Sequence, residues 1–282
     1  FRRVLFRSCR RKTAEKARNG FFLDEIQGMP RAVQVYMDTN DLNQVAEIHE
    51  MIVRLYKQDF TKYEERDKLK LREIYDAMAG ELDSKNKRFR INALGTGMSY
   101  DRVENAFLWL KEAGVALPVY NLKEPKLPFA ISVNRSLFKL FYSDVGLLTS
   151  RYSPSVKLQV LEKSRSINNG ALFENFAAQE LAAHGEELYY FNSKKQGELD
   201  FVIELDGKVC PIEIKSGKDY KRHRALENVL GDANYEIGKA FIFSDQNTQR
   251  DGRKCYLPIY LLMFVEETKL SDAVYKIDLR GL

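Results

Sequence analysis

The sequence predicts a mixed α/β fold (α+β in its arrangement), with a helical N-terminal part followed by a sheet flanked by helices. In the C-terminal half, short apolar segments typical of strands alternate with helical patterns. Asp206-Gly207 separates two runs of alternating apolar residues, and this dipeptide favours a two-residue hairpin turn with positive φ at both positions. At 282 residues and 44% hydrophobic content, the chain is long enough for several small cores.

The N-terminal part is predicted to be mostly helical. From Asp41 to about Leu82 the apolar residues recur three or four apart between many charges, as in a solvated outer helix without a site. A further helix is expected from Ser99, its N-cap, to Gly114, its C-terminal stop, followed by a strand over 115–122. It would bury one apolar stripe: Val103, Ala106, Phe107 and Leu110.

This helix and strand together are similar to a winged helix-turn-helix. The exposed residues of the helix are close to neutral, with Asp101, Glu104 and Glu112 among them, so packing or domain coupling is favoured over DNA binding. Pro125 and Pro128 indicate a linker and a domain boundary. Beyond them we expect strands near 138–142 and 187–192, a helix over 168–184, the hairpin, a helix near 223–233, and strands over 239–243 and 256–265.

The hairpin carries the candidate site. With a two-residue turn at Asp206-Gly207, the residue numbers of each facing pair add up to 413. Asp200 is therefore expected opposite Glu213. Alternation places Lys215 on the same face, and the apolar residues on the other. Two facing carboxylates repel, and a divalent cation that prefers oxygen ligands would relieve the repulsion. The alternative is that these charges are the solvated face of a half-exposed hairpin.

Glu174 strengthens the metal interpretation. On the predicted helix it shares a stripe with Ala177, Ala178 and Leu181, so the sequence places an acid on an apolar face that points to the sheet. A buried acid requires a partner or a metal ion.

The order of Glu174, Gly-Glu-Leu-Asp-Phe-Val (197–202) and Pro-Ile-Glu-Ile-Lys-Ser-Gly (211–217) resembles the PD-(D/E)XK nuclease superfamily. The stretch 28–266 also resembles the C-terminal part of a family of prokaryotic AAA-type ATP-binding proteins, through segments 28–33, 138–148, 170–175 and 256–260. The resemblance implies a restriction-endonuclease-like sheet, with Glu174, Asp200 and Glu213 as metal ligands and catalytic residues, and Lys215 as a catalytic residue.

The resemblance also implies the organisation of residues 9–282, whereas residues 1–8 are interpreted from their own sequence. Residues 1–8, Phe-Arg-Arg-Val-Leu-Phe-Arg-Ser, read as a translated sequencing adapter, and 9–65 as the remnant of an ATPase lid or helical connector. A winged helix over 66–124 and a nuclease-like domain over 129–282 would follow. The sequence has no G-x-x-x-x-G-K-[ST] motif, so we expect no ATP-binding residues and no ATPase activity here. ATP and the ATPase domain are expected only in a full-length protein.

Two functions follow from these residues. The first is a nuclease that uses Mg²⁺ or Mn²⁺ and acts on nucleic acid, whose phosphates would be followed by Lys218, Lys221, Arg222 and Arg224. The second is a non-catalytic module that binds nucleic acid or protein and is coupled to the ATPase domain.

Composition and residue spacing give limited information on partners, metal binding and compartment. The net charge of +5 is small beside 85 charged residues, and therefore does not indicate a partner. Three scattered cysteines and three histidines lack zinc-ligand spacing and favour a reducing, cytoplasmic compartment. The longest apolar run, 256–265, is too short to span a membrane.

Overall fold

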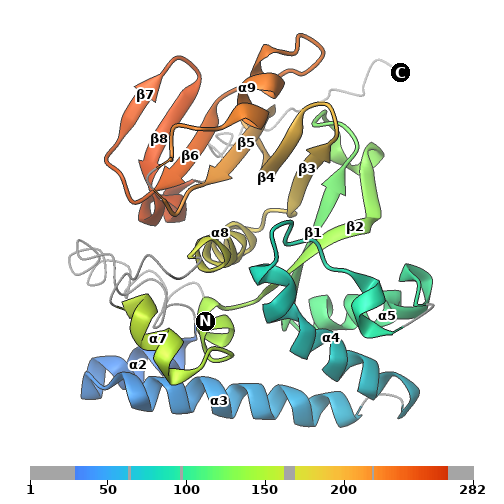
Figure 1. Cartoon of the computed structure of the whole chain (residues 1–282), viewed down its shortest axis with the longest axis vertical. Helices are drawn as coiled ribbons and strands as arrows, with labels where there is room; N and C mark the ends of the chain where they lie inside the picture. The colour runs from blue at the N-terminus through green and yellow to red at the C-terminus, as the bar shows by residue number, and fades with distance from the viewer. Residues whose placement is uncertain (1–28, 63–64, 96–97, 162–168, 218, 266–282) are drawn as a thin grey trace, which may run out of the picture.

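The computed structural model describes residues 29–62, 65–95, 98–161, 169–217 and 219–265, and the expected mixed α/β fold is confirmed (Figure 1). Its centre is an eight-stranded sheet in the order β2-β1-β3-β4-β5-β6-β8-β7. The strands are β1 (Ala116–Leu122), β2 (Val133–Tyr142), β3 (Tyr189–Ser193), β4 (Gly197–Leu205), β5 (Lys208–Ile214), β6 (Ala240–Ser244), β7 (Gln249–Asp251) and β8 (Lys254–Pro258). The pairs β1/β3, β5/β6 and β6/β8 are parallel, and the other neighbours are antiparallel.

In the N-terminal part, the described residues form four helices: α2 (Pro30–Thr39), α3 (Leu42–Asp59), α4 (Glu65–Asp83) and α5 (Tyr100–Glu112). The helical prediction for 41–82 therefore holds, although a 3₁₀ turn, η2 (Phe60–Lys62), precedes α4. A second 3₁₀ turn, η3 (Ile91–Leu94), precedes α5, whose buried stripe is the predicted one. Ser99 is the N-cap of α5 as expected, but its side chain makes no capping hydrogen bond.

The segment with Pro125 and Pro128 connects two neighbouring strands of one sheet. It lies between β1 and β2, which pair along most of their length, and the short turn η4 (Phe129–Ile131) follows it. The strands after α5 thus belong to the same sheet as the hairpin. The domain boundaries and the winged-helix assignment stay predictions.

The hairpin forms with the expected turn and register. Asp206 and Gly207 have φ values of 53° and 70°, as a turn of this kind requires. The paired residues run from Leu205 with Lys208 to Phe201 with Ile212. The residue numbers of each pair add up to 413, as the expected register requires. Pro211 faces Val202 in this ladder.

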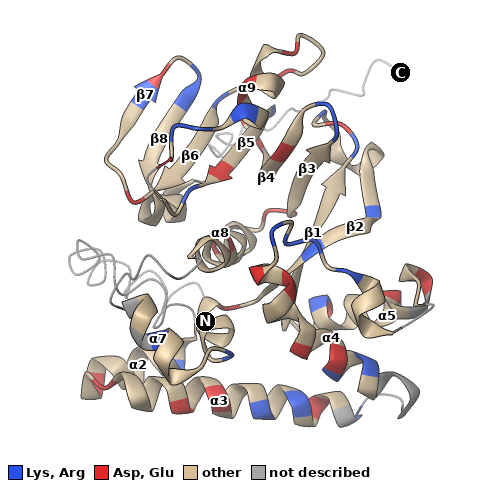
Figure 2. Cartoon of the chain, in the orientation of Figure 1, with Lys and Arg blue, Asp and Glu red and all other residues tan. Residues whose placement is uncertain are grey.

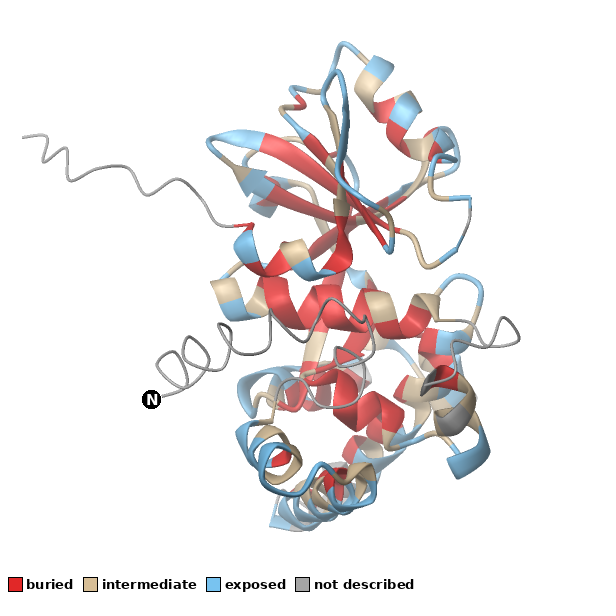
Figure 3. Ribbon diagram, turned by 90° about the vertical axis from the view of Figure 1, so that its left-hand side faces the viewer, coloured by how far each residue is buried: buried red, intermediate tan, exposed pale blue. Residues whose placement is uncertain are grey.

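Helix α8 (Gly170–His184) lies against the sheet and is buried along most of its length. It contacts β1, β2 and β5 as well as the short helix α6 (Val145–Thr149). Figure 3 shows the band of buried residues that passes through the middle of the molecule at this level. Since nearly every side of α8 is covered, any charge that it carries toward the sheet must find a partner inside the protein.

The remaining helices flank or follow the strands. Helix α7 (Pro154–Leu161) precedes α8, and α9 (Arg224–Gly231) packs on β4. The predicted strand over 256–265 is wrong in its second half. β8 ends at Pro258, and the chain turns into a 3₁₀ helix, η5 (Ile259–Phe264), because a proline cannot donate to the strand ladder. No helix among the described residues is long and apolar enough to cross a membrane.

Candidate active site

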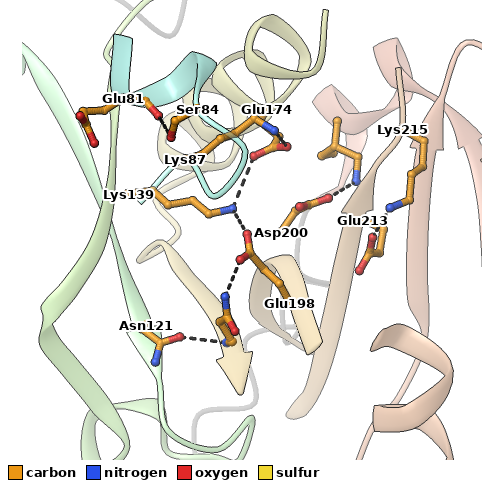
Figure 4. Close-up of polar contacts among 12 residues, drawn as sticks. Glu81, Ser84, Lys87, Asn121, Lys139, Glu174, Glu198, Asp200, Glu213 and Lys215 are labelled. Atoms are coloured by element: carbon orange, nitrogen blue, oxygen red, sulfur yellow. Dashed lines mark hydrogen bonds and ion pairs between the residues drawn. The ribbon is translucent and has the colours of Figure 1, made fainter. Parts of the chain in front are cut away.

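Asp200 lies where the β4–β5 ladder stops. The paired residues of the ladder end at Phe201 and Ile212, one position short of the expected pair of Asp200 and Glu213. Instead, Oδ2 of Asp200 accepts a hydrogen bond of 2.8 Å from the backbone N–H of Ile214. The Ile214 N–H, which would otherwise be available to continue the ladder, thus donates to the Asp200 carboxylate. This hydrogen bond fixes the Asp200 side chain at the end of the paired region (Figure 4).

Glu213, near the end of β5, and Lys215, just after this strand, lie in close contact. The Nζ of Lys215 lies 2.6 Å from Oε2 of Glu213, while the buried Oε1 has no hydrogen-bond partner among the described residues. Burial and the nearby Asp200 raise the pKa of Glu213 to about 8, against the opposing effect of Lys215. Burial alone would lower the pKa of Lys215, but Glu213 and Asp200 outweigh it and raise this pKa.

Glu174 projects from α8 and is buried, as the sequence predicts. Its partners are two lysines from distant parts of the chain. Nζ of Lys87 lies 2.8 Å from Oε1, and Nζ of Lys139 lies 3.5 Å from Oε2. Burial and the charge of Asp200 raise the pKa of Glu174, although Lys139 and Lys87 oppose this. The buried acid therefore has partners that its sequence pattern did not reveal.

Lys139 is the most deeply buried charge at the site, with a side chain 1% exposed. From β2 it reaches Oε1 of Glu198 on β4 at 2.7 Å and lies 5.2 Å from the ring centroid of Tyr190. Burial would lower the pKa of Lys139, but Glu174, Glu198 and Asp200 outweigh it, so the pKa rises. An ammonium group held in this way is charged and structurally fixed.

The network continues from Glu198 to the other strands. Nδ2 of Asn192 on β3 donates to Oε2 of Glu198 at 2.5 Å, and Oδ1 of Asn121 on β1 accepts from the Asn192 backbone N–H at 2.9 Å. Figure 4 shows this chain of contacts running from the turn after α4 to β1. Residues from both halves of the sequence therefore hold the site together.

The four predicted site residues come together as one coupled group. Asp200 perturbs Glu174, Glu213 and Lys215 alike, so all four lie within electrostatic reach. Yet no three His, Cys, Asp or Glu side chains of the described residues are close enough to hold one metal ion. The oxygen donors suit Mg²⁺ or Mn²⁺, which typically uses one or two carboxylates plus water. The unpartnered Oε1 of Glu213 also fits a cation ligand, so a pair of carboxylates rather than a triad matches this geometry.

The structure describes three of the four cations that are predicted to contact phosphates. Lys221 and Arg222 are exposed between β5 and α9, Arg224 is exposed at the start of α9, and Lys218 lies outside the described residues. The sequence interpretation missed Lys87 and Lys139. The basic run 85–90 was a visible signal for Lys87, whereas Lys139 lies in an apolar strand and only the folded sheet brings it to Glu174.

Two segments of the chain match known families. Residues 26–155 match DUF8612 and residues 169–262 match DUF4143, each described as a domain of unknown function. DUF4143 is found in C-terminal regions associated with AAA ATPases. The first match extends across the predicted linker at 125–128, and residues 156–168 lie between the two matches. No curated protein and no solved structure matches the chain significantly.

Proposed function

We propose that this chain carries a metal-dependent phosphodiesterase site of the PD-(D/E)XK nuclease type that acts on nucleic acid. The observation that carries the proposal is the coupled group of Glu174, Asp200, Glu213 and Lys215, supplied by α8, β4 and β5. Buried groups whose pKa values are shifted by one another are concentrated at catalytic sites.

Asp200 and Glu213 would hold a Mg²⁺ or Mn²⁺ ion, with Glu174 beside them. When bound, such an ion would neutralise phosphate charge and lower the pKa of a bound water. The ion pairs of Lys215 with Glu213 and of Lys87 with Glu174 compete with the cation for the same oxygens. Metal binding would therefore require side-chain rearrangement of these lysines.

The protein's own groups have separate roles in this proposal. The backbone N–H of Ile214 orients the carboxylate of Asp200. Lys215 is 26% exposed at its side chain, so its ammonium group can turn from Glu213 toward a phosphate oxygen and stabilise its charge. Lys139 is a positioning residue, since it is too deeply buried to reach a substrate and instead holds Glu174 and Glu198.

The test is cleavage of single-stranded and double-stranded DNA and RNA with Mg²⁺ or Mn²⁺. We expect cleavage by the parent chain and its loss in Lys215→Ala. Lys208→Ala is the matched control, because Lys208 is exposed on the same strand at the hairpin turn. Equal activity of the parent and Lys215→Ala, or none in either, contradicts the catalytic proposal.

A second candidate is supported by the two lysine partners of Glu174. With Lys87 and Lys139 in place, the buried acid is compensated without any metal, as a structural ion-pair network would be. The chain would then be a non-catalytic module that binds nucleic acid or protein, coupled to an AAA-type ATPase domain. Calorimetric titration separates the two, because binding of a macromolecule without binding of Mg²⁺ or Mn²⁺ favours the module.

A further inference from the structure

The turn between α4 and η3 carries four cations within six residues: Lys85, Lys87, Arg88 and Arg90. It stands beside α8, where Figure 2 shows its lysine and arginine residues together. Lys85 and Arg88 are exposed, and neither forms an ion pair with another described residue. Lys87 and Arg90 are paired with Glu174 and Glu81, so Lys85 and Arg88 are the two cations of the turn whose charge faces solvent.

The protein fixes the shape of this turn at several points. The N–H of Phe89, a buried residue, donates to the carbonyl of Phe138 on β2 at 2.9 Å. Arg90 binds the carboxylate of Glu81 through both its backbone N–H and its guanidinium group. A turn held at its end in this way presents Lys85 and Arg88 in a defined arrangement, at less entropic cost on binding than a mobile loop.

Lys87 connects the turn to the carboxylate site. Its φ of 47° lies in the left-handed region, which costs a lysine energy, and its side chain is directed inward to Glu174. In Figure 4, Lys87 and Lys215 lie on opposite sides of Glu174 and Asp200. The exposed cations of the turn thus stand at the margin of the proposed phosphodiesterase site.

The acidic side chains of the site cannot themselves attract a polyanion. Lys139 is buried in ion pairs and cannot contact a phosphate, so the attraction must come from cations around the site. An ordinary solvated turn would also be charged, but it would not be joined by a lysine to the carboxylates themselves. The position of this turn distinguishes it from the other exposed cations.

We infer that the turn of residues 84–90 binds the phosphate backbone of the nucleic acid on which the site acts, through Lys85 and Arg88. The inference rests on the proposed function and adds a substrate contact to it. Contacts of this kind are independent of sequence and weaken with salt, because binding releases counterions from the nucleic acid.

The experiment measures binding by fluorescence anisotropy in EDTA, so that neither metal binding nor cleavage contributes. Labelled single-stranded DNA, the same sequence as a duplex, and the matching RNA are titrated over a series of salt concentrations. Lys85→Ala/Arg88→Ala is compared with the parent chain. The control is Arg54→Ala/Lys111→Ala, which removes two exposed helical cations on α3 and α5 without an ion pair among the described residues.

We expect the turn variant to lose about tenfold in affinity and its salt slope to fall by about one per cation removed, while the control stays close to the parent. Preference among the three probes identifies the form of nucleic acid. Equal binding by the turn variant and the parent overturns the inference, as does an equal loss in the control or no binding of any probe by the parent. Mg²⁺ titration and the Lys215→Ala cleavage assay test the proposed function separately, because Lys85 and Arg88 do not contact the carboxylates.

Discussion

The ammonium group of Lys87 lies 2.8 Å from Oε1 of Glu174, although the two residues are 87 positions apart in the sequence. This pair joins the turn after α4 to the N-terminal part of α8, and so joins the two segments that match different domain families. It also places a cation where a metal ligand is proposed. A metal ion bound at Glu174, as proposed, would therefore have to compete with this lysine.

Lys87→Met tests that competition. Removing one positive charge beside the carboxylates should tighten Mg²⁺ binding by about tenfold, since like charges a few ångströms apart repel strongly in a partly buried site. The variant should also be less stable by about 1–3 kcal/mol, because Glu174 keeps Lys139 as its partner but loses the closer one. Calorimetric titration and urea unfolding measure the two effects.

Lys85→Met is the control for Lys87→Met, as it removes an exposed charge from the same turn. It should change neither quantity much. Weaker Mg²⁺ binding by Lys87→Met would show that Lys87 supports the ion rather than competing with it.

Asp200 has a structural role that can be separated from its proposed role in metal binding. Asp200→Ala leaves the Ile214 N–H without its acceptor, at a cost of about 1–3 kcal/mol in the free energy of unfolding. Asp200→Asn keeps an acceptor oxygen and should be nearly as stable as the parent. Both variants should lose Mg²⁺ binding because both lose the negative charge.

Unfolding curves and metal titrations of the same two Asp200 variants check this, with the exposed Glu204→Ala on β4 as control. Undiminished Mg²⁺ binding by Asp200→Asn would remove Asp200 from the ligand set. Equal stability of the alanine and asparagine variants would show that the Ile214 hydrogen bond contributes little.

Local patterns were enough to predict much of the hairpin. The Asp206-Gly207 dipeptide and the alternation of apolar residues determine the turn and register, and both depend on near neighbours only. The end of the ladder was not predictable in this way. It depends on the Asp200 side chain replacing a backbone acceptor, a choice that alternation does not encode.

The burial of Glu174 followed from the period of its helix, but its partners did not. Lys139 lies in β2 and Lys87 in a turn, and both meet Glu174 only through the packing of α8 on the sheet. A sequence pattern shows that a buried acid needs compensation, without showing whether a metal ion or a lysine supplies it. The partners of buried charges are long-range contacts, and here they change the interpretation of the site.

The pKa of Glu213 predicts a pH dependence of stability. Its folded value of about 8 lies above its unfolded value of 4.5, so between these pH values the folded protein holds a proton that the unfolded chain has released. Unfolding then releases a proton, and stability contributed by the neutral carboxyl group falls as the pH rises through this window. Below about pH 4.5 the contribution is complete.

Glu213→Gln should flatten that dependence, because glutamine imitates the neutral acid. Melting temperatures measured from pH 5 to pH 9 should decline less in the variant than in the parent, across the window given by the pKa near 8. Glu204→Gln, exposed on β4, is the control and should follow the parent. Parallel curves for Glu213→Gln and the parent would mean that Glu213 ionises in the folded protein as it does in the unfolded chain.

The Lys139–Glu198 pair predicts a strong energetic coupling. Lys139→Met leaves Glu174 and Glu198 without their shared cation, and breaking a buried pair of this kind costs about 3–5 kcal/mol. Adding Glu198→Gln removes one of the two carboxylates that Lys139→Met leaves without this cation. The double variant should therefore be more stable than the sum of the two single losses predicts. Urea unfolding of the parent, both single variants and the double variant gives the coupling energy, expected at about 0.5–3 kcal/mol. Additive losses in the free energy of unfolding would show that Lys139 acts through Glu174 alone. Since Glu198 is not a proposed metal ligand, Glu198→Gln should bind Mg²⁺ as the parent does.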